Sequence, residues 1–385
     1  MRYRLSFALI LAAAFAAPAA HAEWGARENI AAAALANAFV DPQSRSDVPQ
    51  TPGISVAVSR NGEIVYSAGF GEARPSVSAT AETVYQVGSI SKQFTAAAVL
   101  SLIENGTRIE NSGAALTLEI PVADIIPGAT AWAIEGGPPI TVKHLLSMTS
   151  NLPNFTRRPP QDIDPWGTVP APRLLDALTH LRPNGYPDSF EYSNTSYFLL
   201  AELIESPLLE RGPRDYRNVV KSAVWEKAAL ASTGFRDEAR FFDRFAAPHY
   251  KRRPAFLMSD WLKGSGDAAS TVLDLQAWDR ALISGAIVRK PLLDEMFSEN
   301  ARVDVWTWYG MGWFIARKDG VDYFSHSGSV PGYTAYSLIA HVSQGNWASV
   351  TILTNSDGVE GLDELAQALA QMALSDSDGL HLSKD

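Results

Sequence analysis

The chain of 385 residues contains no cysteine. It can therefore form no disulfide bond, no thiolate metal site and no lipid anchor attached through a cysteine. It also lacks the Gly-x-Ser-x-Gly motif of α/β-hydrolases, the His-Glu-x-x-His motif of zinc enzymes and the Gly-x-x-x-x-Gly-Lys motif of phosphate-binding loops. These absences argue against the three classes, and no motif implies a metal ion or an organic cofactor.

Basic residues are outnumbered by acidic ones. The chain has 32 Lys and Arg against 42 Asp and Glu, which gives a formal net charge of −10. Such a surface is a poor partner for nucleic acid or for an anionic membrane. Hydrophobic residues make up 46% of the chain, so it can bury the core of one large domain or of two ordinary ones.

Residues 1–22 have the pattern of a secretory signal peptide. Arg2 and Arg4 precede an apolar stretch over residues 5–17, and Ala20-His21-Ala22 matches a cleavage site. The apolar stretch is short for a membrane span, and no later stretch reaches that length. We therefore expect cleavage after Ala22 and a periplasmic or secreted protein without a membrane anchor. Loss of both arginines would make its net charge −12.

The order of apolar patterns along the chain predicts an α/β (α+β) fold. Alternating stretches around Asn61-Gly62 are typical of a β-hairpin, and an alanine-rich helix is expected before them, over residues 29–40. Further strands and a closing helix are expected near the C-terminus, over residues 311–317, 321–325, 333–340, 349–353 and 362–373. We therefore expect one antiparallel sheet, flanked by helices and formed by residues 23–106 and 265–385.

The middle of the chain, residues 107–264, predicts a mostly helical domain beside that sheet, because helical patches alternate there with proline-rich loops. One of these loops, residues 157–173, contains five prolines and two acidic residues. Its composition favours a surface loop or a lid rather than a packed element, and a passive insertion fits as well.

The strongest catalytic signal is Ser89-Ile90-Ser91-Lys92, where a strand-like stretch passes into a helical one. Residues three apart share a helix face, so Lys92 can reach the hydroxyl of Ser89. A serine nucleophile needs a partner that takes its proton, and a partly neutral lysine can do so. Backbone N–H groups at the helix start can face an oxyanion. The pattern favours acyl transfer through a covalent seryl intermediate, although Ser-x-x-Lys also arises by chance.

Tyr192-Ser193-Asn194 precedes a helical stretch and is a second candidate. A tyrosine beside a cationic lysine can lose its proton more easily and relay it between the serine and a leaving group. The amide of Asn194 offers a donor and an acceptor to a substrate amide. Tyr216-Arg217-Asn218 has the same pattern, but its charge-dense surroundings indicate a solvated helix face. A packed aromatic ring at a helix start is the alternative for Tyr192.

His326-Ser327-Gly328-Ser329 lies between two strand-like stretches. An imidazole and a hydroxyl there would lie on a strand edge, and Gly328 would let a substrate approach the backbone. The N–H of Ser329 can then serve as an oxyanion donor. A surface histidine in a hairpin turn is the alternative.

In this order, the three motifs resemble those of the serine β-lactamases and penicillin-binding proteins, which carry Ser-x-x-Lys, Ser-Asp-Asn and Lys-Thr-Gly. Tyr-x-Asn in second place resembles the branch of class C β-lactamases, DD-peptidases and esterases. Residues 144–153 are similar to the His-Leu-Leu-x-x-Thr-Ser-Gly-Leu-Pro segment of that family, with Asn151 in place of the usual Gly. Residues 264–271 are similar to its Gly-Gly-x-x-Ser-Thr segment. The resemblance covers nearly the whole mature chain.

The resemblance implies a serine acyl-hydrolase with its site in a cleft between sheet and helical domain. Ser89 would attack a carbonyl, and Lys92 and Tyr192 would share the base and acid roles, which the sequence does not assign separately. Asn194 and Ser327 would orient a small-molecule or peptide substrate, and the N–H groups of Ser89 and Ser329 would hold the oxyanion. No metal or organic cofactor is implied.

Two departures from the family pattern bear on the substrate. His326 stands where class C β-lactamases carry Lys, and a histidine with a pKa near 6.5 offers a carboxylate less charge. It would bind a substrate carboxylate or tune Tyr192. D-amino-acid amides or peptides and small esters should then be better substrates than β-lactams. If His326 binds carboxylates, activity on carboxylated substrates should rise as the pH falls towards about 6. Phe155 follows Leu152-Pro153-Asn154, near the position where class C β-lactamases carry a Gln. Recognition of substrate side chains should therefore differ from theirs.

Two alternatives stay open. The first is a class C-like β-lactamase. The second, from another class, is a penicillin-binding sensor without turnover. Sensors of this type usually have a membrane anchor, and a decayed enzyme is expected to lose Ser89, Lys92 or Tyr192, all of which are present.

Overall fold

The computed structural model describes residues 25–39, 52–160, 163, 169–210, 214–238, 243–248, 259–356 and 358–375. The expected signal peptide and its cleavage site lie outside the described residues. No helix among the described residues has the length and apolar character that a membrane crossing needs.

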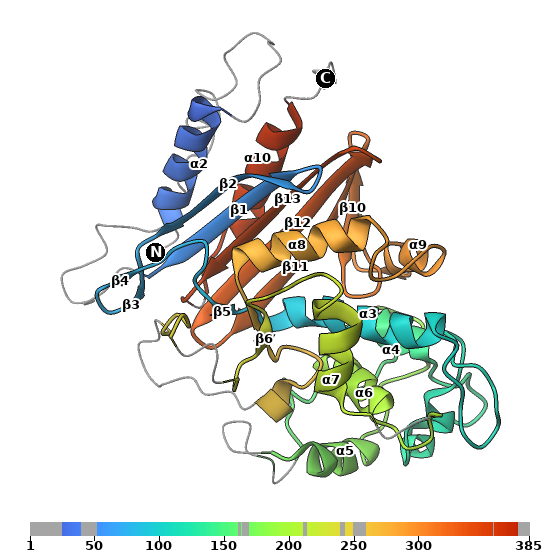
Figure 1. The fold of residues 1–385 in the computed structure, drawn as a ribbon. Helices are drawn as coiled ribbons and strands as arrows, with labels where there is room; N and C mark the ends of the chain where they lie inside the picture. Colours follow the sequence, from blue (N-terminus) through green and yellow to red (C-terminus); the bar gives the residue numbers. More distant parts are fainter. Residues whose placement is uncertain are drawn as a thin grey trace.

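An antiparallel sheet of eight strands forms the upper half of the molecule in Figure 1. From one edge to the other, its strands are β2 (Glu63–Phe70), β1 (Ile54–Arg60), β13 (Asn346–Thr354), β12 (Tyr333–Ser343), β11 (Val321–Val330), β10 (Phe314–Lys318), β9 (Thr307–Tyr309) and β8 (Ala301–Arg302). Strand β1 pairs with β13, so strands from both ends of the chain meet in one sheet. The predicted fold class, an antiparallel sheet flanked by helices, is confirmed.

The hairpin expected at Asn61-Gly62 joins β1 to β2. Both turn residues have positive φ, 51° for Asn61 and 84° for Gly62. Two consecutive left-handed residues make the turn whose twist matches the flanking strands, and Asn followed by Gly tolerates it best.

Helices cover both faces of the sheet (Figure 1). On one face, α2 (Ala26–Phe39) and α10 (Leu362–Ser375) pack against the strands through alanine and leucine side chains. On the other face, α8 (Val272–Ile283) packs against β1 and β13. The two helices expected near the chain ends are thus confirmed, with slightly different ends.

Most of the helices of the chain's middle lie below the sheet in Figure 1, with α3 (Ser91–Glu104) between them and the strands. They are α4 (Val142–Leu146), α5 (Ala171–Thr179), α6 (Asn194–Ile204) and α7 (Tyr216–Val220), followed by a π-helical turn over Lys221–Trp225. A small sheet of β5 (Tyr85–Gln86), β7 (Ala268–Ser270) and β6 (Gly234–Phe235) connects this region to the rest. The domain boundaries at residues 106 and 264 stay a prediction.

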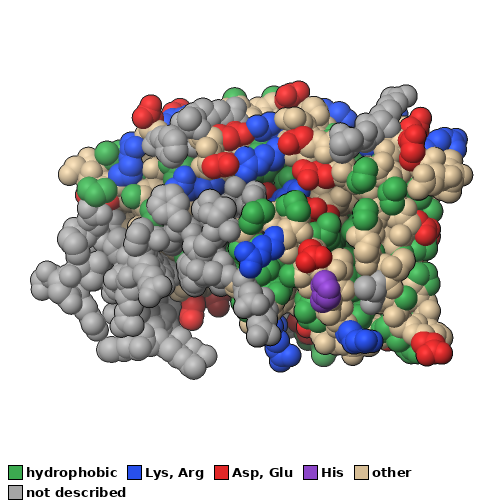
Figure 2. Space-filling view, turned by 90° about the horizontal axis from the view of Figure 1, so that it is seen from below, with side chains coloured by type: hydrophobic (Ala, Val, Ile, Leu, Met, Phe, Trp, Pro, Cys, Tyr) green, Lys and Arg blue, Asp and Glu red, His purple; other side chains and the backbone are tan. Residues whose placement is uncertain are grey.

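The remaining elements are short. They are η1 (Gly88–Ile90), β3 (Glu72–Arg74), β4 (Val77–Ser78), α9 (Leu292–Met296) and the 3₁₀ turns η2 (Val122–Asp124), η3 (Ala129–Trp132) and η6 (Ser259–Leu262). On the face of the molecule seen from below, Lys and Arg side chains alternate with Asp and Glu side chains (Figure 2). Among the residues drawn in colour, that face presents no extended surface of one charge.

Part of the proline-rich segment 157–173 packs into the protein, against the expectation of an unpacked loop. Ile163 and Val169 are both buried in the main hydrophobic core. Helix α5 begins at Ala171, directly after Pro170, and Pro172 stands in its first turn, where a missing N–H costs no intrahelical bond. Residues 161–162 and 164–168 of the segment lie outside the described residues, and its role as a lid stays a prediction.

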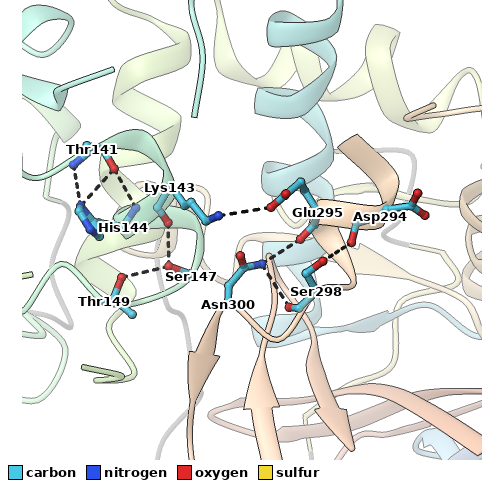
Figure 3. A network of polar contacts seen from close by, with 9 residues as sticks. All are labelled: Thr141, Lys143, His144, Ser147, Thr149, Asp294, Glu295, Ser298 and Asn300. Atoms are coloured by element: carbon cyan, nitrogen blue, oxygen red, sulfur yellow. Dashed lines mark hydrogen bonds and ion pairs between the residues drawn. The ribbon is translucent and has the colours of Figure 1, made fainter. Parts of the chain in front are cut away.

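Polar contacts link the helical region to the sheet (Figure 3). Lys143 on α4 pairs with Glu295 on α9 at 3.3 Å. His144, from the segment that resembles a family motif, caps its own helix: its Nδ1 accepts the N–H of Thr141 at 3.0 Å. The His144 ring thus caps the start of α4.

Strand β11 is longer than predicted. The sequence indicated a strand over 321–325, but pairing with β12 continues to Val330 opposite Tyr333. His326-Ser327-Gly328 therefore lies inside a strand and not in a hairpin turn. Pairing with β10 on the other side ends at Ser325, opposite Phe314. Beyond that point, this edge of β11 faces the turn that carries Ser89.

Candidate active site

Ser89 lies in the 3₁₀ turn η1, directly before helix α3. The turn needs Gly88, whose φ is 52°, and a Cβ at that position would lie 2.8 Å from the N atom of Ser329. Ser91 pins the turn, because its hydroxyl donates to the carbonyl of Gly88 at 2.7 Å and accepts the N–H of Ala268 at 3.0 Å. The side chain of Ser89 is thereby held half-buried beside the end of β11.

Lys92 is fully buried and its amine has three acceptors within hydrogen-bond distance. The Nζ atom lies 3.0 Å from Ser89 Oγ, 2.7 Å from Asn194 Oδ1 and 2.7 Å from the carbonyl oxygen of Ser265. A neutral amine has two N–H groups and one lone pair. The amide and carbonyl oxygens can take the two N–H groups, which aims the lone pair at the serine hydroxyl.

Burial also favours the neutral amine. It lowers the pKa of Lys92 well below the usual value, against the opposing charge of Asp267. Asp267 is itself buried, which raises its pKa to about 7. Its carboxylate accepts the N–H of Gly264 at 3.1 Å and so braces the turn that presents the Ser265 carbonyl to Lys92.

Tyr192 lies next to both residues. Its hydroxyl is hydrogen-bonded to Ser89, and its ring centroid lies 4.9 Å from Lys92 Nζ. Burial raises the pKa of Tyr192, and the bond to Ser89 and the charge of Arg157 offset this only in part. The expectation that Tyr192 loses its proton more easily is therefore wrong, because desolvation of the phenolate is the largest effect on its pKa. At neutral pH Tyr192 is an O–H donor.

Asn194 is the first residue of α6, and its amide is directed at the protein. Its Oδ1 accepts from Lys92, and its Nδ2 donates to Thr156 Oγ1 at 2.8 Å. Asn154 accepts the backbone N–H of Asn194 at 3.3 Å and the hydroxyl of Thr156 at 2.9 Å. Asn194 is thus placed to orient Lys92 first, which leaves one N–H of its amide for a substrate.

The edge of β11 that has no β10 partner forms the side of the site nearest the sheet. Ser327 and Ser329 are exposed, while His326 and Gly328 point inwards. Gly328 has no room for a side chain, because a Cβ there would lie 1.9 Å from the carbonyl oxygen of Val87. This close approach brings the N–H of Ser329 next to the backbone of Gly88 and Ser89. The residues predicted from the three motifs therefore meet in one place.

The family model described as Beta-lactamase matches residues 29–373 of this chain. The chain belongs to the Beta-lactamase family. PbpX of Bacillus subtilis (strain 168), a penicillin-binding protein by name, is 24% identical over 323 residues, which cover 82% of this chain and 73% of that protein. At the level of the family, the prediction of a serine hydrolase of the β-lactamase and penicillin-binding-protein type is confirmed.

Two solved structures share the fold of this Beta-lactamase family member. The octameric penicillin-binding protein homologue of Pyrococcus abyssi is 25% identical, with a TM-score of 0.70 over 84% of this chain and 74% of the other. D-amino acid amidase of Ochrobactrum anthropi SV3 is 22% identical, with a TM-score of 0.66 over 88% of this chain and 98% of the other.

His326, the main departure from the family pattern, is buried and neutral. Its Nδ1 donates to the carbonyl of Ser327 at 2.6 Å, which leaves Nε2 to accept from the hydroxyl of Tyr309 at 3.3 Å. Burial, helped by the charge of Lys92, lowers the pKa of His326 to about 3, against the opposing bond to Ser327. The expectation of a histidine that titrates near pH 6 is therefore wrong, and a neutral imidazole offers a substrate carboxylate no charge. Its ring packs instead against Tyr192 and Phe314.

Phe155 and Asn151 also have structural roles. Phe155 is fully buried and packs edge-on against Phe198 and Trp261. The expectation that side-chain recognition differs from that of class C enzymes stays a prediction. Asn151 has a φ of 55°. Asparagine is one of the few residues that tolerate this left-handed conformation, which explains how it replaces the usual Gly.

Tyr216, the competing Tyr-x-Asn candidate, does not belong to this site. The prediction of a solvated helix face was wrong for the tyrosine itself, which is 1% exposed. Its hydroxyl lies 3.0 Å from Thr95 Oγ1, on the helix that carries Lys92. Tyr216 is therefore a core residue and not part of the candidate active site.

Sequence reasoning missed several groups that complete the site. The carbonyl of Ser265 and the side chains of Asn154, Thr156 and Asp267 all hold Lys92 or Asn194 in place. The Ser265 carbonyl and Asp267 lie in segment 264–271, whose resemblance to the family was the available signal, while Asn154 and Thr156 follow directly after the similar segment 144–153. Within the residues that the structure describes, no three His, Asp or Glu side chains are grouped to hold a metal ion.

Proposed function

We propose that this protein is an exported serine acyl-hydrolase that cleaves an amide or ester through a covalent acyl-enzyme on Ser89. The observation that carries the proposal is the environment of Lys92. A buried amine with a lowered pKa, two oxygen acceptors and the serine hydroxyl at 3.0 Å has the geometry of a general base.

In the proposed reaction, Ser89 Oγ attacks the carbonyl carbon and its proton passes to Lys92. The N–H groups of Ser89 and Ser329 hold the negative oxygen of the tetrahedral intermediate. Tyr192, which keeps its proton at neutral pH, donates it to the leaving nitrogen or oxygen and recovers one from Lys92. Water then attacks the acyl-enzyme and gives a proton to the same pair, which returns it to Ser89 Oγ as the acid is released. Asn194 and Ser327 orient the substrate, and His326 packs behind Tyr192.

The proposed substrates are D-amino-acid amides or peptides and small esters. The likeness to a D-amino acid amidase supports this class, as does the absence of a charged side chain at position 326. A class C-like β-lactamase is the second candidate, since the same machinery can open a lactam ring. Export would follow removal of residues 1–22, and N-terminal sequencing of the secreted protein tests it.

Replacement of the nucleophile tests the mechanism. Ser89→Ala should lose both labelling by a fluorophosphonate probe and turnover, by on the order of 10³-fold or more. Ser284→Ala, an exposed serine at the end of α8, is the matched control and should retain both. Near-normal hydrolysis by Ser89→Ala would refute the covalent mechanism.

A turnover screen separates the remaining candidates. A short ester, a D-Ala-D-Ala peptide and a cephalosporin are compared at equal concentrations. Faster turnover of the cephalosporin than of the other two would favour a β-lactamase. A stable label on Ser89 without turnover of any of the three would favour a penicillin-binding sensor and overturn the proposed hydrolase.

A further inference from the structure

One buried carboxyl behind the site is used by no step of the proposed reaction. Asp267 belongs to segment 264–271, which is similar to the Gly-Gly-x-x-Ser-Thr segment of the family. Counted back from Ser270-Thr271, the second glycine of that pattern falls at position 267. The carboxyl is therefore a departure of this chain from the pattern, and its burial costs free energy.

The turn that contains Asp267 packs on the helix that carries Lys92. Lys92 Nζ donates to the carbonyl of Ser265 at 2.7 Å. On the other side of Asp267, the N–H of Ala268 donates to the hydroxyl of Ser91 at 3.0 Å. Asp267 therefore lies between two contacts of its turn with α3, two residues from the carbonyl that Lys92 contacts.

The carboxyl of Asp267 closes this turn with one oxygen only. Its Oδ2 accepts the N–H of Gly264 at 3.1 Å, while its Oδ1 is buried and has no hydrogen-bond partner among the described residues. One oxygen is enough to brace the turn, and an asparagine would supply it without the cost of burying a charge. The second oxygen points to an electrostatic role.

The Lys92 amine becomes charged in the proposed reaction, and its three acceptors are neutral. They are the hydroxyl of Ser89, the amide oxygen of Asn194 and the peptide carbonyl of Ser265. A buried ammonium is costly unless an opposite charge lies nearby. The negative charge that acts on Lys92 is that of Asp267, which raises the pKa of the amine against the larger effect of burial.

The charge of Asp267 itself changes near neutral pH. The charged and titratable groups that face it from the neighbouring elements are Lys92, Tyr216, Arg217 and Lys263. Burial raises the pKa of Asp267 to about 7, and the N–H of Gly264 and the charges of Arg217 and Lys263 oppose this. Lys263 is itself paired with Glu202 and Glu205, each at 2.6 Å.

We propose that Asp267 is a positioning residue that supplies the counter-charge for Lys92 when the amine takes up the proton of Ser89. This inference rests on the proposed function and deepens it. In the step concerned, the proton moves from Ser89 Oγ to Lys92 Nζ, the Oγ–carbon bond forms, and the carbonyl π electrons move to the oxyanion. Asp267 neither gives nor takes a proton there. Without its charge, Lys92 is a weaker base and acylation is slower.

Asp267→Asn tests the charge, because it keeps an oxygen for the Gly264 N–H. The measurement is the pH profile of kcat/KM for p-nitrophenyl acetate. The acid limb should shift to lower pH by about one unit, since a less basic Lys92 stays neutral at lower pH. The plateau should fall about three- to tenfold, since a weaker base accepts the proton less readily. In wild type the limb belongs to the pair, because Asp267 and Lys92 titrate together.

Asp267→Gly restores the residue of the family pattern and removes both the charge and the brace. It should shift the acid limb as far as Asp267→Asn does, and it should lose further activity because the turn is no longer closed. A residue that only braces the turn would behave differently. Asp267→Asn would then keep the wild-type limb, and Asp267→Gly alone would lose activity.

Asp279→Asn is the matched control, since it is the same change at another fully buried carboxyl. Asp279 lies on α8, and its charge is not among those that act on Lys92. The acid limb of this variant should coincide with that of wild type. All profiles are measured over the pH range in which unfolding curves show each protein to be folded.

A ¹³C NMR titration of Lys92 Cε, with its resonance identified by Lys92→Arg, needs no turnover. Lys92 should titrate about one unit lower in Asp267→Asn than in wild type. Either an unmoved acid limb or an unmoved Lys92 titration in Asp267→Asn would overturn the role of Asp267, and so would an equal shift in Asp279→Asn. A shifted Lys92 titration in a protein that neither turns over an ester nor acylates Ser89 would reject the hydrolase proposal and leave the charge coupling standing.

Discussion

At the scale of single residues, the site is governed by which groups the fold removes from water. Lys92, Tyr192 and His326 all have shifted pKa values, and burial is the largest cause for each. In the proposed reaction, these shifts support a neutral lysine as the base and a protonated tyrosine as the proton donor. Desolvation thus favours one division of the base and acid roles that the motifs left open.

The neutral His326 leads to a prediction for His326→Lys. The new ammonium would be buried beside Lys92, where burial disfavours a charged group, at a cost of about 3 kcal/mol or more. We expect a lower Tm and no rise in the ratio of cephalosporin to ester turnover. His326→Gln keeps a neutral acceptor for Tyr309 and should lose less stability.

The measurements are thermal unfolding and kcat/KM for one cephalosporin and one neutral ester. A His326→Lys protein with the wild-type Tm and a raised lactam-to-ester ratio would show that the side chain reaches the substrate. Such a result would restore the role that the sequence first suggested for this position.

The residue types and their order were predictable, while their ionisation was not. Ser89, Lys92, Tyr192 and Asn194 stand out because motif spacing is a local property of the sequence. The pKa of His326 is lowered by burial, to which contact with Tyr309 and Phe314 contributes, and by Lys92, and these residues come from three other places in the chain. No local pattern carries that information.

At the scale of elements, the site depends on one close contact between a strand and a turn. Strand β11 extends past the end of β10, and its free edge lies against η1. The contact is possible only because Gly88 and Gly328 have no side chains. The sequence indicated Gly328 as a point of close approach, but the approaching group is the Val87 carbonyl rather than a substrate.

Gly328→Ala should therefore separate β11 from η1. The added Cβ would lie 1.9 Å from the carbonyl oxygen of Val87, so strand or turn must move by about 1 Å. We expect a loss of activity on the order of 10²-fold, because the Ser329 N–H moves away from Ser89. Destabilisation should be about 1–3 kcal/mol.

Gly185→Ala is the matched control, since the nearest atom to its added Cβ would lie 3.8 Å away. Ester turnover and denaturant unfolding are measured for both variants. Full activity in Gly328→Ala would mean that the oxyanion donors do not depend on this contact.

Strand limits were the weakest part of the sequence prediction at this scale. Alternation of apolar and polar residues ends at Ser325, so the pattern ends there, although pairing with β12 continues to Val330. A strand that serves a site on one edge carries small and polar residues, and these do not produce the alternation on which the prediction depends.

At the scale of the whole molecule, both ends of the chain contribute to one sheet, and the sheet carries the core. The antiparallel class was predictable because the apolar patterns gather at the two ends. The polar layer inside that core was not. Between α8 and the sheet, Gln276 donates to Thr351 at 2.8 Å and accepts from Ser349 at 2.7 Å. Asp279, on the same helix, is fully buried.

Asp279 gives the stability of the protein a definite pH dependence. Burial raises the pKa of this carboxyl well above its usual value. The folded state then holds a proton that the unfolded state has lost, at every pH between the unfolded and folded pKa values. Stability must fall as pH rises through that window, by about 1.4 kcal/mol for each unit of pKa elevation.

Asp279→Asn should remove this dependence, because an amide of the same shape does not titrate. The difference in unfolding free energy between variant and wild type should move in favour of the variant from about pH 4 to pH 8. Asp188→Asn, an exposed acid, is the control and should show no such trend. Denaturant titrations at several pH values measure the difference in unfolding free energy between the two proteins. Lys92 contributes equally to both, so its opposite pH dependence cancels in the difference. A difference that stays constant with pH would mean that Asp279 is ionised in the folded core, and that an unidentified cation or water stabilises it there.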